Sequence, residues 1–492
     1  MDPSSPATAS PDEAGAPGAP RLREIRDLPG PRGWPLLGNS LQIESSRFHR
    51  QLEGWARENG PLFQLRMGRR RFLVVADHRV VATVLRDRPD GFRRTERLET
   101  LGVEMGLLPG VFSSSGESWR KQRRMVMSGF DPGHVKRYYP SMVRVAQRLA
   151  GRWRTAAAAD QPIDLQSDLM RYTVDTIAGL AFGSDVNTLE SEGDVIQQHL
   201  DKIFPAFFKR LLSPIPLWRF VRTADDRRLD ASIAEVRKAV AGFIAEARER
   251  MANNPALRED PDNLLEAMIV AADQPDSGID DALLAGNVLT MLLAGEDTTA
   301  NTLAWMIDLL WRHPEALRRA TDEVRRLCGD ADAPTIEQIA GLDFVEACAH
   351  ETMRLKPVAP ILAMQALHDT AIADVRVPAG AVAWMLMRHD GVSETHVQRA
   401  AEFDPDRWLA ADGPSPSSAR RVSMPFGAGP RICPGRYLAL LEIKLAIAVL
   451  LGRFDLLSVD TPDGEPAKEH LSFTMMPVGL RMRVRARDEV AA

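Results

Sequence analysis

A single uninterrupted helical pattern runs from about Asp280 to Arg312, and it limits the possible folds more than any other feature. Apolar residues recur three and four positions apart along it, and Pro314 ends it because proline cannot continue a helix. At 1.5 Å per residue such a helix is about 50 Å long, which is more than the width of a small domain. The sequence therefore predicts a large protein with one long helix crossing its core.

The segments before and after this helix follow different patterns. Two strand-like runs flank a turn at Gly68, and the chain from Val80 to about His350 is overwhelmingly helical. After Pro357 come short β-like pieces, interrupted by one more helix at Pro434 to Leu451. These patterns predict a mainly α fold with small β-sheets (α+β), made of a large helical domain and a smaller β-rich domain.

The first residues differ in composition from the rest. Residues 1–27 are rich in Pro, Ala, Ser and Gly and have neither the basic start nor the apolar core of a signal peptide, so we expect a disordered tail. No comparable linker divides residues 28–492, which we expect to form a single catalytic domain.

Composition excludes several classes of protein. A net charge of −5 argues against a nucleic-acid-binding protein, and three cysteines are too few for a disulfide framework. The most apolar stretch, Tyr437 to Leu451, contains Glu442 and Lys444, so no transmembrane anchor is expected. We expect a cytoplasmic monomer.

The segment around Cys433 contains the residues that best indicate the chemistry of the protein. It reads PFGAGPRICPGRYLALLEIKLA, a glycine-rich loop followed by an amphipathic helix. Gly427, Gly429 and Gly435 let the backbone turn tightly and approach a flat ligand closely. Pro434 suits a first helical position, which would place Cys433 at a helix N-terminus, where the dipole favours a thiolate.

This loop resembles the haem-binding loop of the cytochrome P-450 superfamily, through Phe426-x-x-Gly429-x-Arg431-x-Cys433-x-Gly435. The resemblance covers about residues 29 to 488. It implies a haem b whose iron is held by Cys433, with Phe426 packed against the loop and Arg431 paired with a haem propionate. Cys328 and Cys348 are interpreted as buried structural thiols.

Within the long helix, Glu296, Asp297 and Thr298 form a polar cluster after Ala294 and Gly295. Thr298 can bond back to the carbonyl of Ala294, loosening the helix and leaving room for water and O2 beside the haem. An acid beside an alcohol can then relay protons for oxygen activation. This arrangement resembles the acid-alcohol pair of the superfamily, although the residues alone are also compatible with a kink bearing two exposed acids.

Other motifs follow the order of the superfamily. Glu351 and Arg354 share a helix face, and the resemblance of Phe403-x-Pro405-Asp406-Arg407-Trp408 adds Arg407 to their buried network, which supports folding and haem retention. Trp119 and Arg123, one helical turn apart, resemble a propionate-binding pair. One position departs from the pattern: many relatives have a further propionate-binding arginine where this chain has only Met364 and Gln365.

The resemblance also places the substrate pocket. Its walls are expected at residues 101–112, 204–220, 358–364 and 473–476 and on the long helix, all rich in Phe, Leu, Met and Pro. Such walls suit a fatty acid, terpenoid, steroid or polyketide. Arg69, Arg70 and Arg71 lie on a hairpin that is near the pocket mouth in relatives, where they are either solvated or meet a fatty carboxylate. The expected pocket residues are Leu293, Ala294, Val358, Ile361, Leu362, Phe473 and Met475.

The electrons for this chemistry are expected from another protein. No flavin, nicotinamide or iron–sulfur motif follows the cysteine loop, so we expect O2 as co-substrate and NAD(P)H electrons delivered by a ferredoxin or flavodoxin with its reductase. A basic docking surface is expected from Arg120, Lys121, Arg123, Arg124, Arg436 and Lys444. The alternatives are a peroxide-driven haem-thiolate enzyme and a non-catalytic haem sensor.

Overall fold

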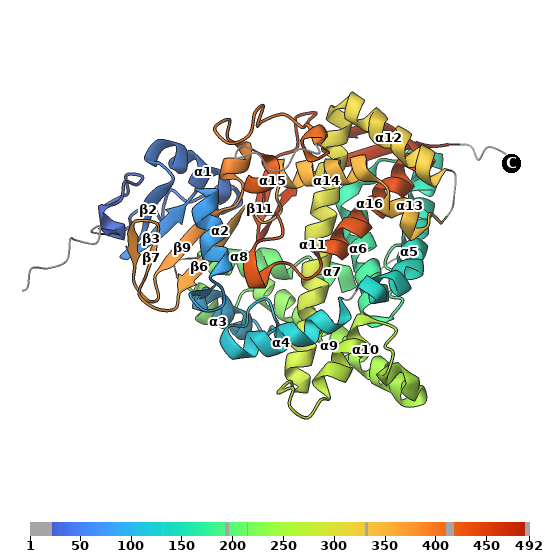
Figure 1. The fold of residues 1–492 in the computed structure, drawn as a ribbon, viewed down its shortest axis with the longest axis horizontal. Coiled ribbons are helices and arrows are strands. Elements are labelled where there is room, and N and C mark those ends of the chain that lie inside the picture. Colours follow the sequence, from blue (N-terminus) through green and yellow to red (C-terminus); the bar gives the residue numbers. More distant parts are fainter. Residues whose placement is uncertain are drawn as a thin grey trace, which may run out of the picture.

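The protein is described by a computed structural model, which covers residues 22–130, 132–191, 196–213, 215–329, 333–409 and 418–487. A β-rich part and a larger helical part lie side by side (Figure 1). The β-rich part combines the start of the chain, in blue, with segments that follow Pro357, in orange. The predicted α+β class is confirmed.

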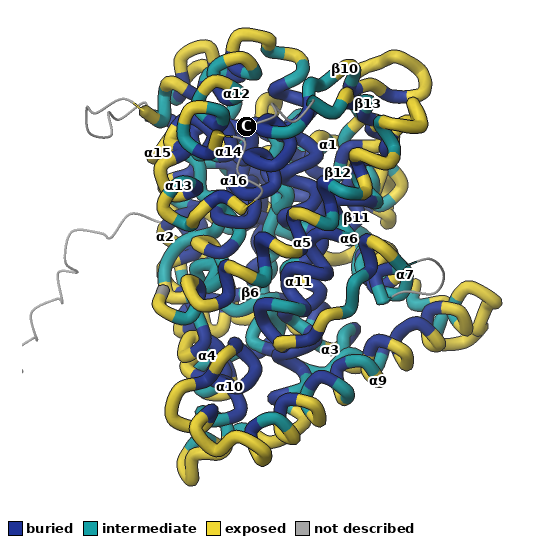
Figure 2. The backbone as a smooth tube through the Cα atoms, turned by 90° about the vertical axis from the view of Figure 1, so that its right-hand side faces the viewer, coloured by how far each residue is buried: buried dark blue, intermediate teal, exposed yellow. Residues whose placement is uncertain are grey.

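The long helix α11 (Asp281–Arg312) runs through the interior of the helical part (Figure 2). Asp280 caps it, because its carboxylate accepts a hydrogen bond of 2.8 Å from the backbone N–H of Leu283. Pro314 begins the next helix, where its missing N–H costs nothing. Both ends lie within one residue of the prediction, and helix α6 packs along the middle of α11.

Other helices surround α11. The first group consists of α1 (Phe48–Asn59), α2 (His78–Arg86), α3 (Glu96–Glu104), α4 (Gly116–Gly129), α5 (Pro132–Ala158), α6 (Leu165–Phe182), α7 (Ile196–Leu200), α8 (Ile203–Leu212), α9 (Ala224–Asn253) and α10 (Leu264–Ala272). The second group consists of α12 (Pro314–Cys328), α13 (Ile336–Ala340), α14 (Asp343–Leu355), α15 (Ala419–Val422) and α16 (Arg436–Arg453). One continuous apolar core joins most of them.

The largest sheet has five strands in the order β2-β3-β9-β6-β4. The predicted hairpin is present, with Gly68 in the left-handed region at φ 58°. Its second strand pairs in parallel with β9, which is about 300 residues away in sequence and therefore had no local signal. The strands are β2 (Leu62–Met67), β3 (Arg70–Val75), β4 (Phe92–Arg94), β6 (Ile361–Ala366) and β9 (Val382–Leu386).

Three smaller sheets complete the β structure, in the orders β1-β8-β7, β10-β13-β5 and β11-β12. Their strands are β1 (Arg23–Glu24), β5 (Ile163–Asp164), β7 (Thr370–Ile372), β8 (Val375–Val377), β10 (Phe454–Asp460), β11 (Glu469–Ser472), β12 (Thr474–Pro477) and β13 (Arg481–Ala486).

Two predicted boundaries are wrong. The expected tail of residues 1–27 ends too late: β1 pairs with β8, Arg23 bonds to Asp374, and Ile25 is buried. Residues 1–21 lie outside the described residues. Helix α16 begins at Arg436 rather than Pro434, because Gly435 is its N-cap and Pro434 lies in the preceding turn. Within the described residues, no helix is long and apolar enough to span a membrane.

Candidate active site

The loop before α16 is closed by its own backbone. The N–H of Cys433 donates a 2.9 Å hydrogen bond to the carbonyl of Phe426, and Gly427 and Gly429 have φ of 75° and 71°. A side chain at Gly429 is impossible, since its Cβ would lie 2.6 Å from the Cα of Arg86 at the end of α2. The glycines therefore seat the loop against α2 and hold Cys433 in a fixed position.

Cys433 differs from the other two cysteines in its surroundings. Burial raises the pKa of its thiol, but a backbone hydrogen bond from Gly435 and the positive charges of Arg123 and Arg436 oppose that shift. Burial and the acids around Glu323 hold the pKa of Cys348 well above the ordinary value, and Arg319 opposes them only in part. Cys433 is half-buried, whereas Cys328 and Cys348 are buried. Among the cysteines, Cys433 is the one suited to bind a metal ion as a thiolate.

Arginines gather around this loop without matching acids. Burial lowers the pKa of Arg431 to about 10, with a contribution from Arg88. Burial, together with Arg431 and Arg88, holds the pKa of Arg94 well below its ordinary value. Arg123 donates to the carbonyl of Ile432 at 2.8 Å. Within the described residues, no carboxylate bonds to any of these four arginines.

Two arginine nitrogens in this cluster have no hydrogen-bond partner, which indicates that the cluster can bind an anion. Arg431 Nη1 and Arg94 Nε are buried without a hydrogen-bond partner, which is costly for a charged group. The guanidinium of Arg431 lies 5.1 Å from the ring of Trp119, which is itself buried. Arg88, Arg94 and Arg123 all lie close enough to Arg431 for their charges to interact, and such a group of four cations fits a ligand with two carboxylates, such as the two propionates of haem.

Arg94 was missed by the sequence analysis. It pairs across the β4–β6 ladder with Met364, the position where a propionate arginine was judged absent. Met364 is fully buried in an apolar cluster, and Gln365 bonds instead to the backbone at Glu96 and Gly380. The cation therefore comes from the neighbouring strand, and only the pairing of two distant strands could have revealed it.

On α11 the expected local bond is present. Thr298 Oγ1 donates to the carbonyl of Ala294 at 2.8 Å. Ala294 is exposed and Thr298 half-buried, although most of this part of the helix is buried. Gly295 lets α6 approach, since a Cβ there would lie 3.1 Å from Ile177 Cγ1. The helix thus presents a small residue and a hydroxyl to an interior space.

The two acids next to Thr298 on this helix, Glu296 and Asp297, face a different cavity. Asp297 accepts hydrogen bonds from Asn301 (2.8 Å) and from Thr474 in β12, and burial raises its pKa. Glu296 is buried with Oε1 unpartnered, and burial and Asp201 hold its pKa well above the ordinary value. Both acids line a cavity of about 300 Å³ that also contacts Asp201. The acids and Thr298 therefore share the helix without a direct hydrogen bond between them.

The predicted network around Glu351 is assembled. Its carboxylate is fully buried and accepts from Arg354 (2.7 and 2.8 Å) and from Arg407 (2.9 Å). Trp408 Nε1 adds a fourth bond at 2.9 Å. Although burial favours the neutral acid, these donors lower the pKa of Glu351. Arg354 also binds the carbonyls of Gly391 and Ala400, so the network fixes the chain that precedes the cysteine loop.

Aromatic rings bring three of the expected pocket walls together. Phe473 stacks on Phe204 with ring centroids 4.7 Å apart and meets Phe207 and Phe112 edge to face at 5.6 and 5.9 Å. Phe473 lies at the tip of the β11–β12 hairpin with φ 92°, a strained conformation for a non-glycine residue. Packing on three sides holds it there.

The other expected pocket residues divide into two groups. Val358, Ile361 and Leu362 are half-buried, and Leu293 is buried at 8% exposure. Met475 has no exposed surface and packs with the core around Phe48 and Trp384, so we assign it to the core instead of the pocket wall.

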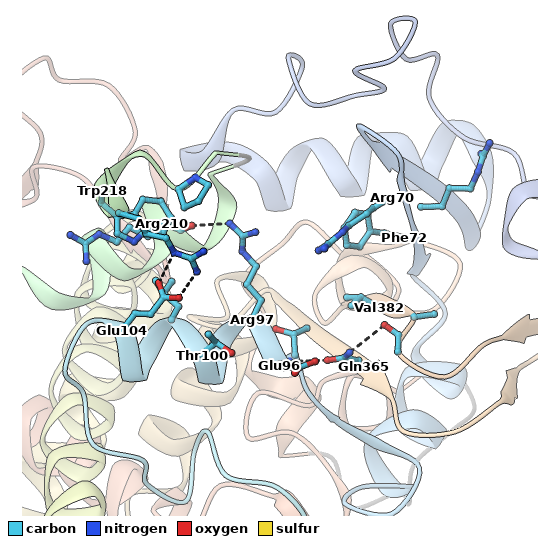
Figure 3. A pocket seen from close by; sticks show the side chains of 17 residues that line it. Arg70, Phe72, Glu96, Arg97, Thr100, Glu104, Arg210, Trp218, Gln365 and Val382 are labelled. Carbon is cyan, nitrogen blue, oxygen red and sulfur yellow. Dashed lines mark hydrogen bonds and ion pairs between the residues drawn. The ribbon is translucent and has the colours of Figure 1, made fainter. Parts of the chain in front are cut away.

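A cavity of about 640 Å³ opens beside α3. In Figure 3 the side chain of Arg97 rises from α3 toward the chain around Arg210 and Trp218. Leu101 lines the same cavity, and its neighbour Gly102 lies against Phe207 of the aromatic group. The cavity thus adjoins the aromatic walls and is bordered by the hairpin residues Arg70 and Arg71.

Comparisons with known proteins agree with this geometry. A family profile described as Cytochrome P450 matches residues 28–484. The chain belongs to the cytochrome P450 family. It is 27% identical, with a TM-score of 0.79, to the crystal structure of a cytochrome P450DA mutant heme domain, covering 94% of this chain and 98% of that one.

Curated relatives include plant and fungal proteins. The chain is 26% identical to the chloroplastic protein LUTEIN DEFICIENT 5 of Arabidopsis thaliana, over 87% of this chain and 73% of that protein. It is 28% identical to a cytochrome P450 of Paris polyphylla, over 85% of each. It is 29% identical to a self-sufficient cytochrome P450 monooxygenase of Oidiodendron maius, over 89% of this chain but only 40% of that protein.

Membership of this family makes the chain a haem-thiolate monooxygenase. The residues present fit the cofactor: Cys433 can hold the iron, and the arginines 88, 94, 123 and 431 can balance two propionates. Bound haem supplies the activation of O2. The chain supplies the fixed thiolate, the cations and the apolar walls around it.

Proposed function

We propose that this cytochrome P450 hydroxylates or epoxidises a long hydrophobic carboxylic acid, using O2 and two electrons from a separate redox protein. The observation that supports this most directly is the charge at the mouth of the 640 Å³ cavity. Among the described residues, Arg97 donates to the carbonyls of Arg210 and Ser213 alone, at 3.1 and 2.5 Å. Burial lowers its pKa, and the nearby Arg70 and Arg219 lower it further.

The mouth has more cations than its own acids can balance. Arg219 pairs with Glu104, and Arg210 pairs with Asp226. Within the described residues, Arg70, Arg71 and Arg97 have no acidic partner. A carboxylate at this point would relieve the repulsion among the arginines, and its chain would extend past Leu101 to the phenylalanines. Of the expected substrate classes, a fatty acid fits this polarity best.

Residues of α11 have distinct roles in this proposal. Thr298, whose hydroxyl is tied to Ala294, orients a water beside the substrate. Asp297 and Glu296 connect the helix to the polar cavity near Asp201 and move protons inward, because burial raises the pKa of both carboxyls and so favours their uptake of a proton. This supply of protons favours O2 chemistry over a peroxide-driven reaction.

Electrons are proposed to arrive at the face of the cysteine loop. Arg124 and Arg436 are exposed there, and Lys121 is half-buried. Lys444 does not belong to this surface, since it is buried and bonded to Glu346 and the carbonyl of Ala340. The remaining cations suit an acidic ferredoxin or flavodoxin.

The first test is the spectrum of the reduced, carbon-monoxide-bound holoprotein. A thiolate-type band that is lost in Cys433→Ala is expected, and its retention in that variant would overturn the iron assignment. Product formation with O2 and a ferredoxin system is then compared with hydrogen peroxide alone. Equal yields from peroxide alone would favour the peroxide-driven alternative, and no substrate-induced change of spin state across a broad set of compounds would favour a haem sensor.

The substrate class has its own test. Dodecanoate should bind the oxidised holoprotein at least about tenfold more tightly than dodecan-1-ol, measured by the spin-state shift, since a charged hydrogen bond contributes about 1.5–3 kcal/mol. Arg97→Leu should remove that difference. Arg144→Leu, on the exposed face of α5, serves as the matched control and should retain it. Equal binding of acid and alcohol by the unmodified protein would refute the carboxylate site.

A further inference from the structure

Three histidines surround one buried carboxylate at the start of α2, away from the cysteine loop. Asp390, in the short helix His389–Val392, accepts from the backbone N–H of His78 at 2.8 Å and contacts His78 Nδ1 at 2.7 Å. His389 Nδ1 lies 3.0 Å from Oδ1 of Asp390, and His396 Nε2 lies 3.5 Å from Oδ2, the oxygen that His78 also contacts. Within the described residues, no lysine or arginine pairs with Asp390.

The charge of this cluster is not balanced by a permanent cation. The carboxylate of Asp390 is 7% exposed, and within the described residues its side-chain partners are imidazoles. Glu351, by contrast, is paired with the arginines Arg354 and Arg407. A buried carboxylate that faces imidazoles alone is a group that a metal cation can bind.

The ring of His78 supplies a second, independent observation. His78 is 5% exposed, and its Nε2 has no hydrogen-bond partner. A buried ring nitrogen without a partner is costly, and it retains a lone pair or a proton that no described residue uses. The rings of His78 and His396 meet edge to face with centroids 5.0 Å apart, so the two imidazoles lie next to each other beside Asp390.

The spacing suits a small transition-metal ion. One ligand atom from each of His78, Asp390 and His396 lies within 4.8 Å of the others. In a tetrahedral zinc site, with bonds of about 2.0–2.1 Å, neighbouring ligand atoms are about 3.4 Å apart. Side-chain rotations that move the ligand atoms by roughly 1.4 Å at most therefore close the site. The side chain of His396 is 26% exposed, which leaves an entry path and a place for a water as the fourth ligand.

We propose that His78, Asp390 and His396 bind one divalent transition-metal ion, with Zn²⁺ as the ion best matched to two imidazoles and one carboxylate. The site is separate from the haem and independent of the proposed substrate. It clamps α2 to the segment that follows β9.

Hydrogen bonds from Arg354 hold the backbone around two of the proposed ligands, whether or not a metal is bound. Arg354 holds the carbonyls of Gly391 and Ala400 at 2.5 and 2.7 Å, so Asp390 and His396 lie on a chain segment that is anchored at both ends. At the other end of α2, Arg88 donates to the carbonyl of Ala428 in the cysteine loop at 3.1 Å. A metal at the start of α2 thus steadies the helix against which that loop packs, which is a structural and not a catalytic role.

The test measures Zn²⁺ itself. Metal-depleted holoprotein is equilibrated with low micromolar Zn²⁺ by dialysis, and bound zinc per haem is measured by mass spectrometry. One zinc per chain is expected. His396→Ala should weaken binding at least about tenfold, because even the loss of an outer partner of a ligand costs about 10–100-fold. Asp390→Asn should do the same while conserving side-chain size. Zinc should also raise the melting temperature of the unmodified protein and not of His396→Ala.

The matched control is His368→Ala, which removes an exposed histidine from the turn between β6 and β7. It should leave both the stoichiometry and the affinity unchanged. X-ray absorption at the zinc edge should show two imidazoles and oxygen ligands at about 2.0–2.1 Å. Wild-type binding no tighter than that of His396→Ala, or a spectrum without imidazole scattering, would show that protons alone bridge the cluster and would overturn the proposal.

Discussion

Two groups of arginines in this protein differ in whether a carboxylate of the chain pairs with them. Arg354 and Arg407 share the carboxylate of Glu351 and fill their remaining donors with backbone carbonyls. Arg94 and Arg431 have no acid partner among the described residues, and each has a buried nitrogen without a hydrogen bond. Among the described residues, only the first group has its negative partner within the chain.

This difference distinguishes arginines that support the fold from arginines that bind a ligand. A cation whose counter-charge is part of the chain stabilises the fold at all times, whereas one without it destabilises the fold until a ligand arrives. Burial of an unbalanced arginine is thus a physical signature of an anionic cofactor. The predictions that follow test this contrast from the largest expected effect to the smallest.

Glu351→Gln should be the most damaging change. It leaves Arg354 and Arg407 buried without a negative charge, and breaking a buried pair costs about 3–5 kcal/mol. Urea unfolding of the holoprotein should show this loss directly. Glu402→Gln, in the neighbouring segment with a side chain that is 58% exposed, should change stability by less than about 0.5 kcal/mol. Similar losses in both variants would contradict the assigned network.

Arg94→Leu should change the protein in opposite directions with and without haem. With haem bound, loss of a charged hydrogen bond of about 1.5–3 kcal/mol should speed transfer of haem to an acceptor globin about 10–100-fold. Without haem, removal of an unbalanced buried charge should raise the melting temperature. Arg124→Leu, at an exposed position on α4, should do neither. A lower melting temperature of the haem-free variant would place Arg94 in the first group of arginines.

Glu296→Gln should alter the pH dependence of stability. A carboxyl whose pKa is raised by folding binds more protons in the native than in the unfolded state, so stability falls as pH rises above its unfolded pKa. The variant removes this slope, which is at most about 1.4 kcal/mol per pH unit. Melting temperatures between pH 5 and 8 should therefore decline less than in the unmodified protein. Glu249→Gln, on the exposed face of α9, should retain the original decline.

Charge reversal at Lys121 and Arg124 should have the smallest effect. It should slow reduction by a ferredoxin roughly tenfold at low salt, and the difference should shrink at high salt because screening weakens long-range attraction. Stopped-flow reduction measures both. Lys238→Glu, whose side chain is 80% exposed on α9, is the control. Unchanged reduction kinetics in the double variant would remove this face as the docking surface.

Local features were predictable from the sequence, and distant pairings were not. Asp280 and Pro314 mark the ends of α11 through capping and ring geometry, which depend on a few neighbouring residues. The bond from Thr298 to Ala294 is likewise local. Arg94 escaped notice because its importance follows from its pairing with Met364, which lies 270 positions further along the chain. The burial of Lys444 and Met475 also depends on neighbours that are distant in sequence.

The five-stranded sheet has a consequence for how the chain is made. Strand β3 is complete early in synthesis, but its parallel partner β9 ends at Leu386, so the edge of the hairpin stays uncovered while helices α2 to α14 emerge from the ribosome. An uncovered edge offers free N–H and C=O groups to other chains. Haem insertion must wait longer still, since Cys433 is translated after β9. Over that interval, aggregation through the uncovered edge competes with folding.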